Sequence, residues 1–181
     1  MSPSLWALVT AVAGLIIAEF KGHRGARAIF KLSASSVFLW EGAQRGLAAD
    51  DVGSLFIMAG LVGCFLGDAA LLSRAKPAFL AGLGSFLLGH LLFAIGFGVR
   101  GPAWPVAGGT LVGLLLPAII VHRWLMPHVE AGMRVPVLAY MAVITSMLAL
   151  AVGLAAATTA WVLLGGAALF SGVTTCLYPL T

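Results

Sequence analysis

The chain alternates long apolar stretches with short breaks that carry glycine, proline or charge. The apolar stretches fall at about 4–20, 27–46, 52–73, 77–99, 104–122, 135–154 and 157–177. Each approaches the roughly 20 residues that an α-helix needs to cross a bilayer. The last break, near 155–159, is the faintest. The pattern predicts an all-α, polytopic transmembrane helix bundle of about seven helices.

Composition agrees with a membrane protein. The 181 residues are 61% hydrophobic with a mean hydropathy of +1.09, and only 9% are charged, against about 25% in soluble domains. Because the breaks are short, residues 1–181 are expected to form a single transmembrane domain. Two GxxxG patterns, Gly63–Gly67 and Gly109–Gly113, are typical of closely packed membrane helices.

Basic residues are distributed unevenly among the breaks. The first, third and fifth breaks hold Lys21, Arg24, Arg27, Arg74, Lys76, Arg123 and Arg134, whereas the second and fourth hold Arg45 and Arg100. The positive-inside rule then places the odd breaks in the cytoplasm and the N-terminus outside. No basic run is long enough to indicate nucleic-acid binding. Richness in Ala, Gly and Leu favours a bacterial inner membrane.

Metal and cofactor chemistry find no support in the sequence. Cys64 and Cys176 are far apart and show no metal-ligand spacing. His90, His122 and His128 lack the HExxH spacing of a zinc hydrolase. We expect no metal and no cofactor, and the sequence indicates no oligomeric state.

Five polar residues interrupt the apolar stretches: Lys31, Glu41, Asp68, His90 and Tyr140. Polar groups inside hydrocarbon are costly and often mark functional sites. At 1.5 Å per residue, Lys31, Asp68 and Tyr140 fall at a similar depth, so we expect them to share one polar pocket. His90 lies deeper, around the middle of its helix.

Structural roles are the alternative for each residue. Lys31 can extend its ammonium to the cytoplasmic surface, or form a purely structural pair with Asp68. His90 can satisfy an interhelical hydrogen bond, and Tyr140 can anchor the chain at the membrane interface. Glu41 is expected to pair with Arg45 one turn later. The functional interpretation rests on the set, because a carboxyl group in a dry site can donate a proton.

Several segments resemble the lysoplasmalogenase family of polytopic membrane proteins, which includes the YhhN-like proteins of bacteria. The resemblance is carried by Gly60–Leu72, which contains a Gly-Asp pair, and by Phe79–Phe93, which contains Gly89-His90. Pro136–Tyr140 with Met147, Gly165–Phe170 and Lys31 also fit the family pattern. The order and spacing of these segments hold across most of the chain.

The C-terminal part departs from the family pattern in two ways. The family continues its Gly-Ala-x-x-Phe segment into a Ser-Asp pair, but Phe170 is followed here by Ser171-Gly172. The family pattern has eight helices, and the chain stops at Thr181 without an eighth. A truncated or altered C-terminus would explain both departures.

The resemblance implies hydrolysis of the vinyl ether bond of lysoplasmalogens, with membrane lysophospholipid as substrate. Under this hypothesis Asp68 is the acid or the carboxylate that stabilises the cation, and Lys31 binds the substrate phosphate or tunes Asp68. His90 and Tyr140 would orient water or the headgroup. A small-solute or proton-coupled transporter and a catalytically disabled lipid-binding protein are the alternatives.

Overall fold

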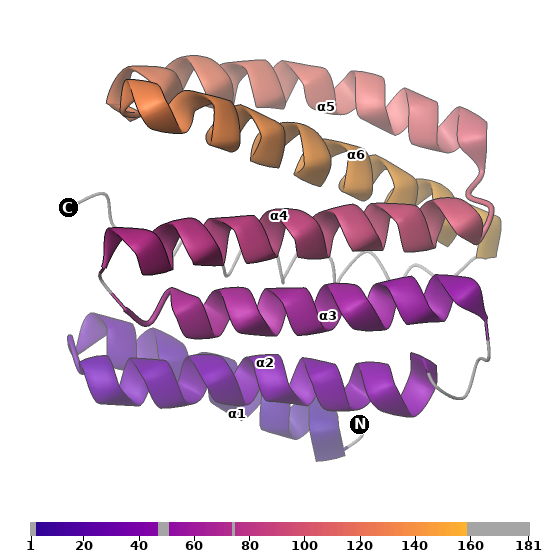
Figure 1. Ribbon diagram of the computed structural model, residues 1–181. Coiled ribbons are helices and arrows are strands. Elements are labelled where there is room, and N and C mark those ends of the chain that lie inside the picture. The colour runs from indigo at the N-terminus through magenta and orange to yellow at the C-terminus, as the bar shows by residue number, and fades with distance from the viewer. Residues whose placement is uncertain (1–2, 47–50, 74, 159–181) are drawn as a thin grey trace. The chain divides into compact units, whose positions relative to one another are not determined.

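The computed structural model describes residues 3–46, 51–73 and 75–158. Within these ranges all long elements are α-helices, and two short 3-10 turns, η1 and η2, join the last two (Figure 1). The elements in chain order are α1 (Pro3–Phe20), α2 (Arg24–Gly46), α3 (Val52–Ala70), α4 (Lys76–Val99), α5 (Trp104–Leu125), η1 (Met126–His128), η2 (Ala131–Met133) and α6 (Arg134–Thr158).

Six of the seven expected helices are confirmed, and the all-α membrane bundle with them. The expected helix at 157–177 lies outside the described residues, apart from its first two positions, which belong to α6. α6 continues to Thr158, through most of the segment 155–159 where the faint break was expected. The expected ends at 73 and 122 differ from the observed ends at Ala70 and Leu125.

Four segments of the described chain are long and apolar enough to cross a membrane: Val52–Ala70, Lys76–Val99, Trp104–His128 and Ala131–Thr158. Trp6–Phe20 is a shorter apolar helix. The protein is thus an integral, multi-pass membrane protein. α2 is not one of these four candidate spans. Its sequence carries five charged residues: Arg24, Arg27, Lys31, Glu41 and Arg45.

Local chemistry explains two helix ends. Gly22 adopts a φ of 66°. Its N–H donates a hydrogen bond to the Glu19 carbonyl, and the N–H of His23 donates one to the Ala18 carbonyl. This is a Schellman motif, in which glycine tolerates the left-handed conformation. At the start of α3, the Asp51 side chain accepts hydrogen bonds from the N–H and the hydroxyl of Ser54. An aspartate N-cap of this kind satisfies N–H groups that have no partner within the helix.

The described chain divides into two compact units, of which the first ends at Gly89. In the first unit consecutive helices run antiparallel, with α2 packed against both α1 and α3 (Figure 1). Glycines bring α3 and α4 together. A Cβ on Gly89 would lie 2.9 Å from both the Cys64 sulfur and the Gly60 carbonyl oxygen, and one on Gly63 would lie 3.2 Å from the Gly89 Cα. The backbones approach because no side chain stands between them.

The two GxxxG patterns behave differently. Gly63 and Gly67 both lie at the α3–α4 contact, where the Phe86 ring fills the space beside Gly67. Gly109 and Gly113 on α5 have open space where a Cβ would project, as far as the described residues show. Only the first pattern therefore marks a close helix contact within the described chain.

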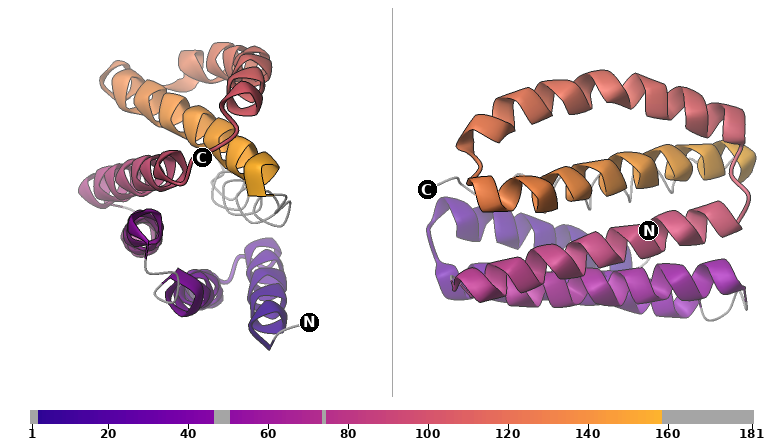
Figure 2. Two further views of the ribbon diagram at one scale, coloured as in Figure 1. Left: turned by 90° about the vertical axis from the view of Figure 1, so that its right-hand side faces the viewer. Right: turned by 45° about the horizontal axis from the view of Figure 1, so that its top comes forward.

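The second unit, from His90 onward, contains the rest of α4 with α5 and α6. The right panel of Figure 2 shows α5 and α6 running antiparallel, with α5 following a curved path. Pro117 lies inside α5, where the missing N–H and the bulk of the ring favour a bend. A backbone hydrogen bond joins the start of α5 to α6, where the Ala103 N–H donates to the Gly153 carbonyl over 2.9 Å. A Cβ on Gly153 would lie only 2.8 Å from that of Ala107.

Exposed side chains on the described helices are largely apolar, as a lipid-facing surface requires. Trp6, Trp40, Trp104 and Trp124 are all more than half exposed and lie near helix ends. That placement matches the interfacial positions expected of tryptophan. Trp161 lies outside the described residues.

Candidate functional site

A buried ion pair joins α2 to α3 in the first unit. The Lys31 ammonium lies 3.1 Å from Asp68 Oδ1, with the Lys31 side chain 19% exposed and that of Asp68 3%. The two residues were expected at similar depth, and the contact confirms that they meet. Lys31 therefore directs its ammonium to a carboxylate rather than extending it to the surface.

The second carboxylate oxygen of Asp68 accepts a hydrogen bond from the Ser35 hydroxyl. Ser35 is buried and lies one turn after Lys31, so both side chains project from the same face of α2. Sequence reasoning missed Ser35. The available signal was its i+4 spacing from Lys31, but serine is common in helices and the sequence does not show which helix faces it.

The two contacts indicate the charge state of Asp68. One oxygen faces an ammonium and the other accepts a hydroxyl hydrogen, an arrangement that suits a carboxylate rather than a carboxylic acid. Oδ1 accepts no hydrogen bond from the described residues, although it is buried. Apart from the Lys31 ion pair, Oδ1 therefore keeps acceptor capacity as far as the described residues show.

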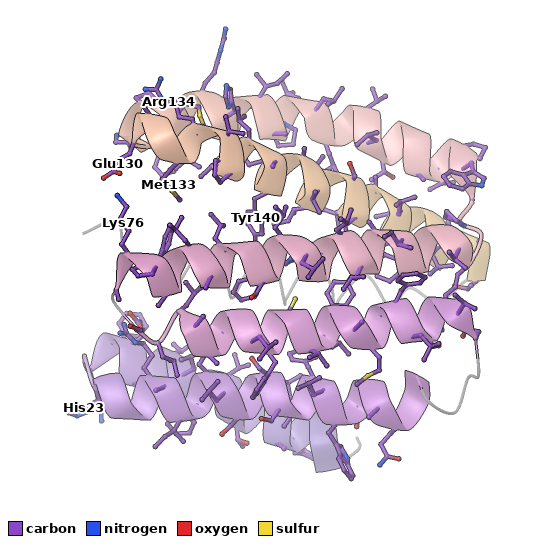
Figure 3. The ribbon with its side chains drawn as sticks, viewed as in Figure 1. His23, Lys76, Glu130, Met133, Arg134 and Tyr140 are labelled. Carbon is purple, nitrogen blue, oxygen red and sulfur yellow. The ribbon has the colours of Figure 1, made fainter. Side chains whose placement is uncertain are left out.

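Aromatic contacts surround His90 in the second unit. Its ring meets that of Tyr140 edge to face, with centroids 5.5 Å apart and an interplanar angle of 80°. Phe93, one turn along α4, makes a similar contact at 6.0 Å. His90 is only 1% exposed. Tyr140 lies on α6 beyond Met133 and Arg134, which stand where that helix begins (Figure 3).

The structure thus brings the expected site residues together as two pairs, Lys31 with Asp68 and His90 with Tyr140. A single pocket containing all of them stays a prediction. So does the Glu41–Arg45 ion pair, because the Arg45 side chain lies outside the described residues. Among the described residues, no group of three or more His, Cys, Asp or Glu side chains is arranged to bind a metal.

Basic residues lie at one end of the first unit. Figure 3 shows His23 at the turn between α1 and α2, and Lys76 at the start of α4, at the same end. Nearby, Arg27 donates two hydrogen bonds to Glu19, of 3.2 and 3.3 Å, and ties the start of α2 to the end of α1.

Comparison with known proteins identifies the family. The model of the YhhN family matches residues 26–173, which include Lys31, Asp68, His90 and Tyr140. The chain belongs to the YhhN family. Ser35 also lies within the matched segment. Lys31 and Ser35, which both contact Asp68 in the first unit, and Asp68 itself are therefore all inside the region that the family model matches.

Two characterised relatives are similar to the chain over 113 residues. The lysoplasmalogenase TMEM86B of Mus musculus is 33% identical over 62% of this chain and 45% of its own length. The enzyme of the same name from Rattus norvegicus is 31% identical over 62% of this chain and 43% of its own length. The match thus spans less than half of each relative. No solved structure matches the chain.

Proposed function

We propose that the protein is a membrane-embedded hydrolase that cleaves the vinyl ether bond of lysoplasmalogens. The observation that carries the proposal is the buried Lys31–Asp68 pair with its Ser35 hydrogen bond, in a family member similar to two lysoplasmalogenases. Buried charges inside a membrane helix bundle are typical of functional sites. The proposed substrates are membrane lysophospholipids with an ethanolamine or choline headgroup.

The reaction places defined demands on a site. A proton added to the β carbon of the vinyl ether converts the α carbon and the ether oxygen into an oxocarbenium ion. Water adds to that ion and releases a proton, and the resulting hemiacetal breaks into a fatty aldehyde and a glycerophospho-ethanolamine or -choline. One water is consumed and no redox partner is needed. The protein must supply an acid, a negative group near the cation and a means to position water.

Asp68 suits the role of the negative group. Its contacts favour the carboxylate, and Oδ1 has no hydrogen bond from the described residues. We assign to Oδ1 the electrostatic stabilisation of the oxocarbenium ion or the orientation of the attacking water. In a site from which water is excluded, a fixed charge acts more strongly than it would in solution.

Lys31 then tunes Asp68 rather than binding the substrate phosphate on its own. Its ammonium faces a carboxylate at 3.1 Å, which offsets most of its attraction for a second anion. We assign His90 and Tyr140 to the orientation of water or of the headgroup, because the imidazole nitrogens and the phenol hydroxyl can form hydrogen bonds and the two rings contact each other.

The proposed location is a bacterial inner membrane with the N-terminus outside. The positive-inside rule supports this orientation, because the basic residues concentrate in the odd loops. The end of the first unit that carries His23 and Lys76 (Figure 3) would then face the cytoplasm.

The test is aldehyde release from an ethanolamine lysoplasmalogen by purified protein in detergent. We expect Asp68→Asn to lower kcat by about 100-fold or more, as expected when a preorganised charge is removed from an active site. Asp51→Asn is the matched control, since Asp51 caps the start of the same helix and Asn caps equally well. Wild-type rates in Asp68→Asn would remove Asp68 from the mechanism.

Absence of turnover by folded wild-type protein would contradict the proposed activity for this chain. The variant Gly172→Asp, which restores the Ser-Asp pair after Phe170, then tests whether the missing aspartate is the cause of the inactivity. Activity gained in that variant would show that the chain lacks only the second carboxylate of the family pattern. Solute flux into proteoliposomes that Asp68→Asn abolishes would instead indicate a transporter.

A further inference from the structure

Ser35 is a buried hydroxyl on α2 that reaches across to a carboxylate on α3. We propose that Ser35 is a positioning residue that fixes the orientation of the Asp68 carboxylate and leaves Oδ1 available for the reaction. The inference rests on the proposed hydrolase function, because it assigns a task within that reaction. Ser35 itself is not required to touch the substrate.

The Asp68 side chain needs such a partner because its own rotamer preference does not fix it. The terminal torsion of aspartate is broad, so the plane of the carboxylate can rotate at little cost. Lys31 provides charge, but its ammonium sits on a flexible four-carbon stem. The Ser35 hydroxyl stands on a single carbon attached to a helix, so its position follows the α2 backbone closely.

The contacts also divide the two oxygens by task. Ser35 occupies Oδ2, whereas Oδ1 faces Lys31 and accepts no hydrogen bond from the described residues. A partial rotation of the carboxylate would move both oxygens out of these contacts and turn the site away from its productive geometry. Small misplacements of a catalytic group cost large factors in rate. Ser35 is therefore expected to affect turnover more than binding.

The packing beside Asp68 supports a fixed arrangement. Cys64, one turn earlier on α3, is fully buried, and Gly67, next to Asp68, is covered by the Phe86 ring from α4. These neighbours hold the backbone of Asp68 in place. The remaining degree of freedom is the rotation of the carboxylate itself, and the Ser35 hydrogen bond restricts it.

The experiment compares Ser35→Ala, Ser35→Thr and Ser36→Ala in the lysoplasmalogen assay with full-length protein. Ser36 is the matched control, because it is the adjacent residue, is exposed, and donates only to the Leu32 carbonyl of its own helix at 2.8 Å. We expect Ser35→Ala to lower kcat by about 10- to 100-fold, the factor that corresponds to a hydrogen bond with a charged group. KM stays unchanged, Ser35→Thr restores most of kcat, and Ser36→Ala behaves as wild type.

Equal kcat in Ser35→Ala and wild type would overturn the inference, as would equal losses in Ser35→Ala and Ser36→Ala. An infrared measurement separates this inference from the proposed function. The Asp68 carboxylate band, assigned by its disappearance in Asp68→Asn, should shift in Ser35→Ala and not in Ser36→Ala. If the wild type shows no turnover, the proposed function fails; an unshifted band in folded Ser35→Ala then overturns the positioning role, and a shifted band retains it.

Discussion

At the scale of single residues, the site depends on how two opposite charges share a buried position. Lys31 and Asp68 form a neutral pair in the first unit, so neither charge is left alone among apolar side chains. The sequence predicted their similar depth from helix geometry. It did not predict Ser35, because which face of α2 meets α3 depends on packing between helices. The His90–Tyr140 contact joins residues far apart in the chain and likewise required the fold.

The Lys31–Asp68 pair should show strong energetic coupling. Lys31→Met leaves a buried carboxylate without its partner, and we expect the free energy of unfolding in detergent to fall by about 3 kcal/mol. Asp68→Asn should be destabilising for the converse reason. The double variant removes both charges, so its cost should be clearly smaller than the sum of the single costs.

Thermal or denaturant unfolding of the three variants measures this coupling. Lys21→Met serves as the control, because Lys21 is exposed in the turn between α1 and α2, where a substitution should change stability by about 0.5 kcal/mol or less. Strict additivity of the two single costs would contradict a coupled pair.

At the scale of elements, glycine decides how closely helices approach, but its pattern in the sequence identifies contacts only in part. Gly63 and Gly67 pack against α4, whereas Gly109 and Gly113 meet no described neighbour. Both glycine pairs have the same GxxxG spacing in the sequence. The difference arises from helix rotation, which depends on the whole set of neighbouring side chains. Most helix ends lie within a few residues of the predicted ones, because glycine and charge in the breaks act locally, as Gly22 and Asp51 do.

Gly89 and Gly84 provide a matched pair on α4. A Cβ at Gly89 would lie 2.9 Å from the Gly60 carbonyl oxygen, whereas Gly84 is exposed with open space around it among the described residues. We expect Gly89→Ala to destabilise the protein by about 1–3 kcal/mol through overpacking. Gly84→Ala should leave stability equal or slightly higher, since alanine favours helix.

The melting temperature of both variants in the same detergent gives the comparison. Because the substitution and the helix are identical, the difference between them isolates the α3–α4 contact. Equal melting temperatures would show that the backbones can separate at no cost, contrary to the close packing at Gly63 and Gly89.

At the scale of the whole molecule, the succession of helices fixes which loops share a side of the membrane. The sequence predicted six of the described helices and the alternation of basic loops. It did not place the helices laterally, because nearly every apolar stretch is equally suited to face lipid or another helix. The expected single domain stays a prediction, and the described chain divides into two compact units.

Orientation can be tested by labelling single cysteines with a membrane-impermeant maleimide in cells whose outer membrane is permeabilised. In a background with Cys64 and Cys176 replaced by alanine, we expect Val52→Cys to react in intact cells and His23→Cys only after lysis. Both positions are exposed and stand at opposite ends of the first unit. The reverse labelling pattern would place the N-terminus in the cytoplasm.

The ion pair between α2 and α3 also bears on how the chain enters the membrane during synthesis. The sequence of α2 holds five charged residues, and α2 is absent from the described segments that qualify as spans by composition. Among the described residues, Lys31 is paired with Asp68, which is synthesised later. We therefore expect the translocon to retain α2 until α3 emerges, so that the two helices enter the lipid together as a hairpin.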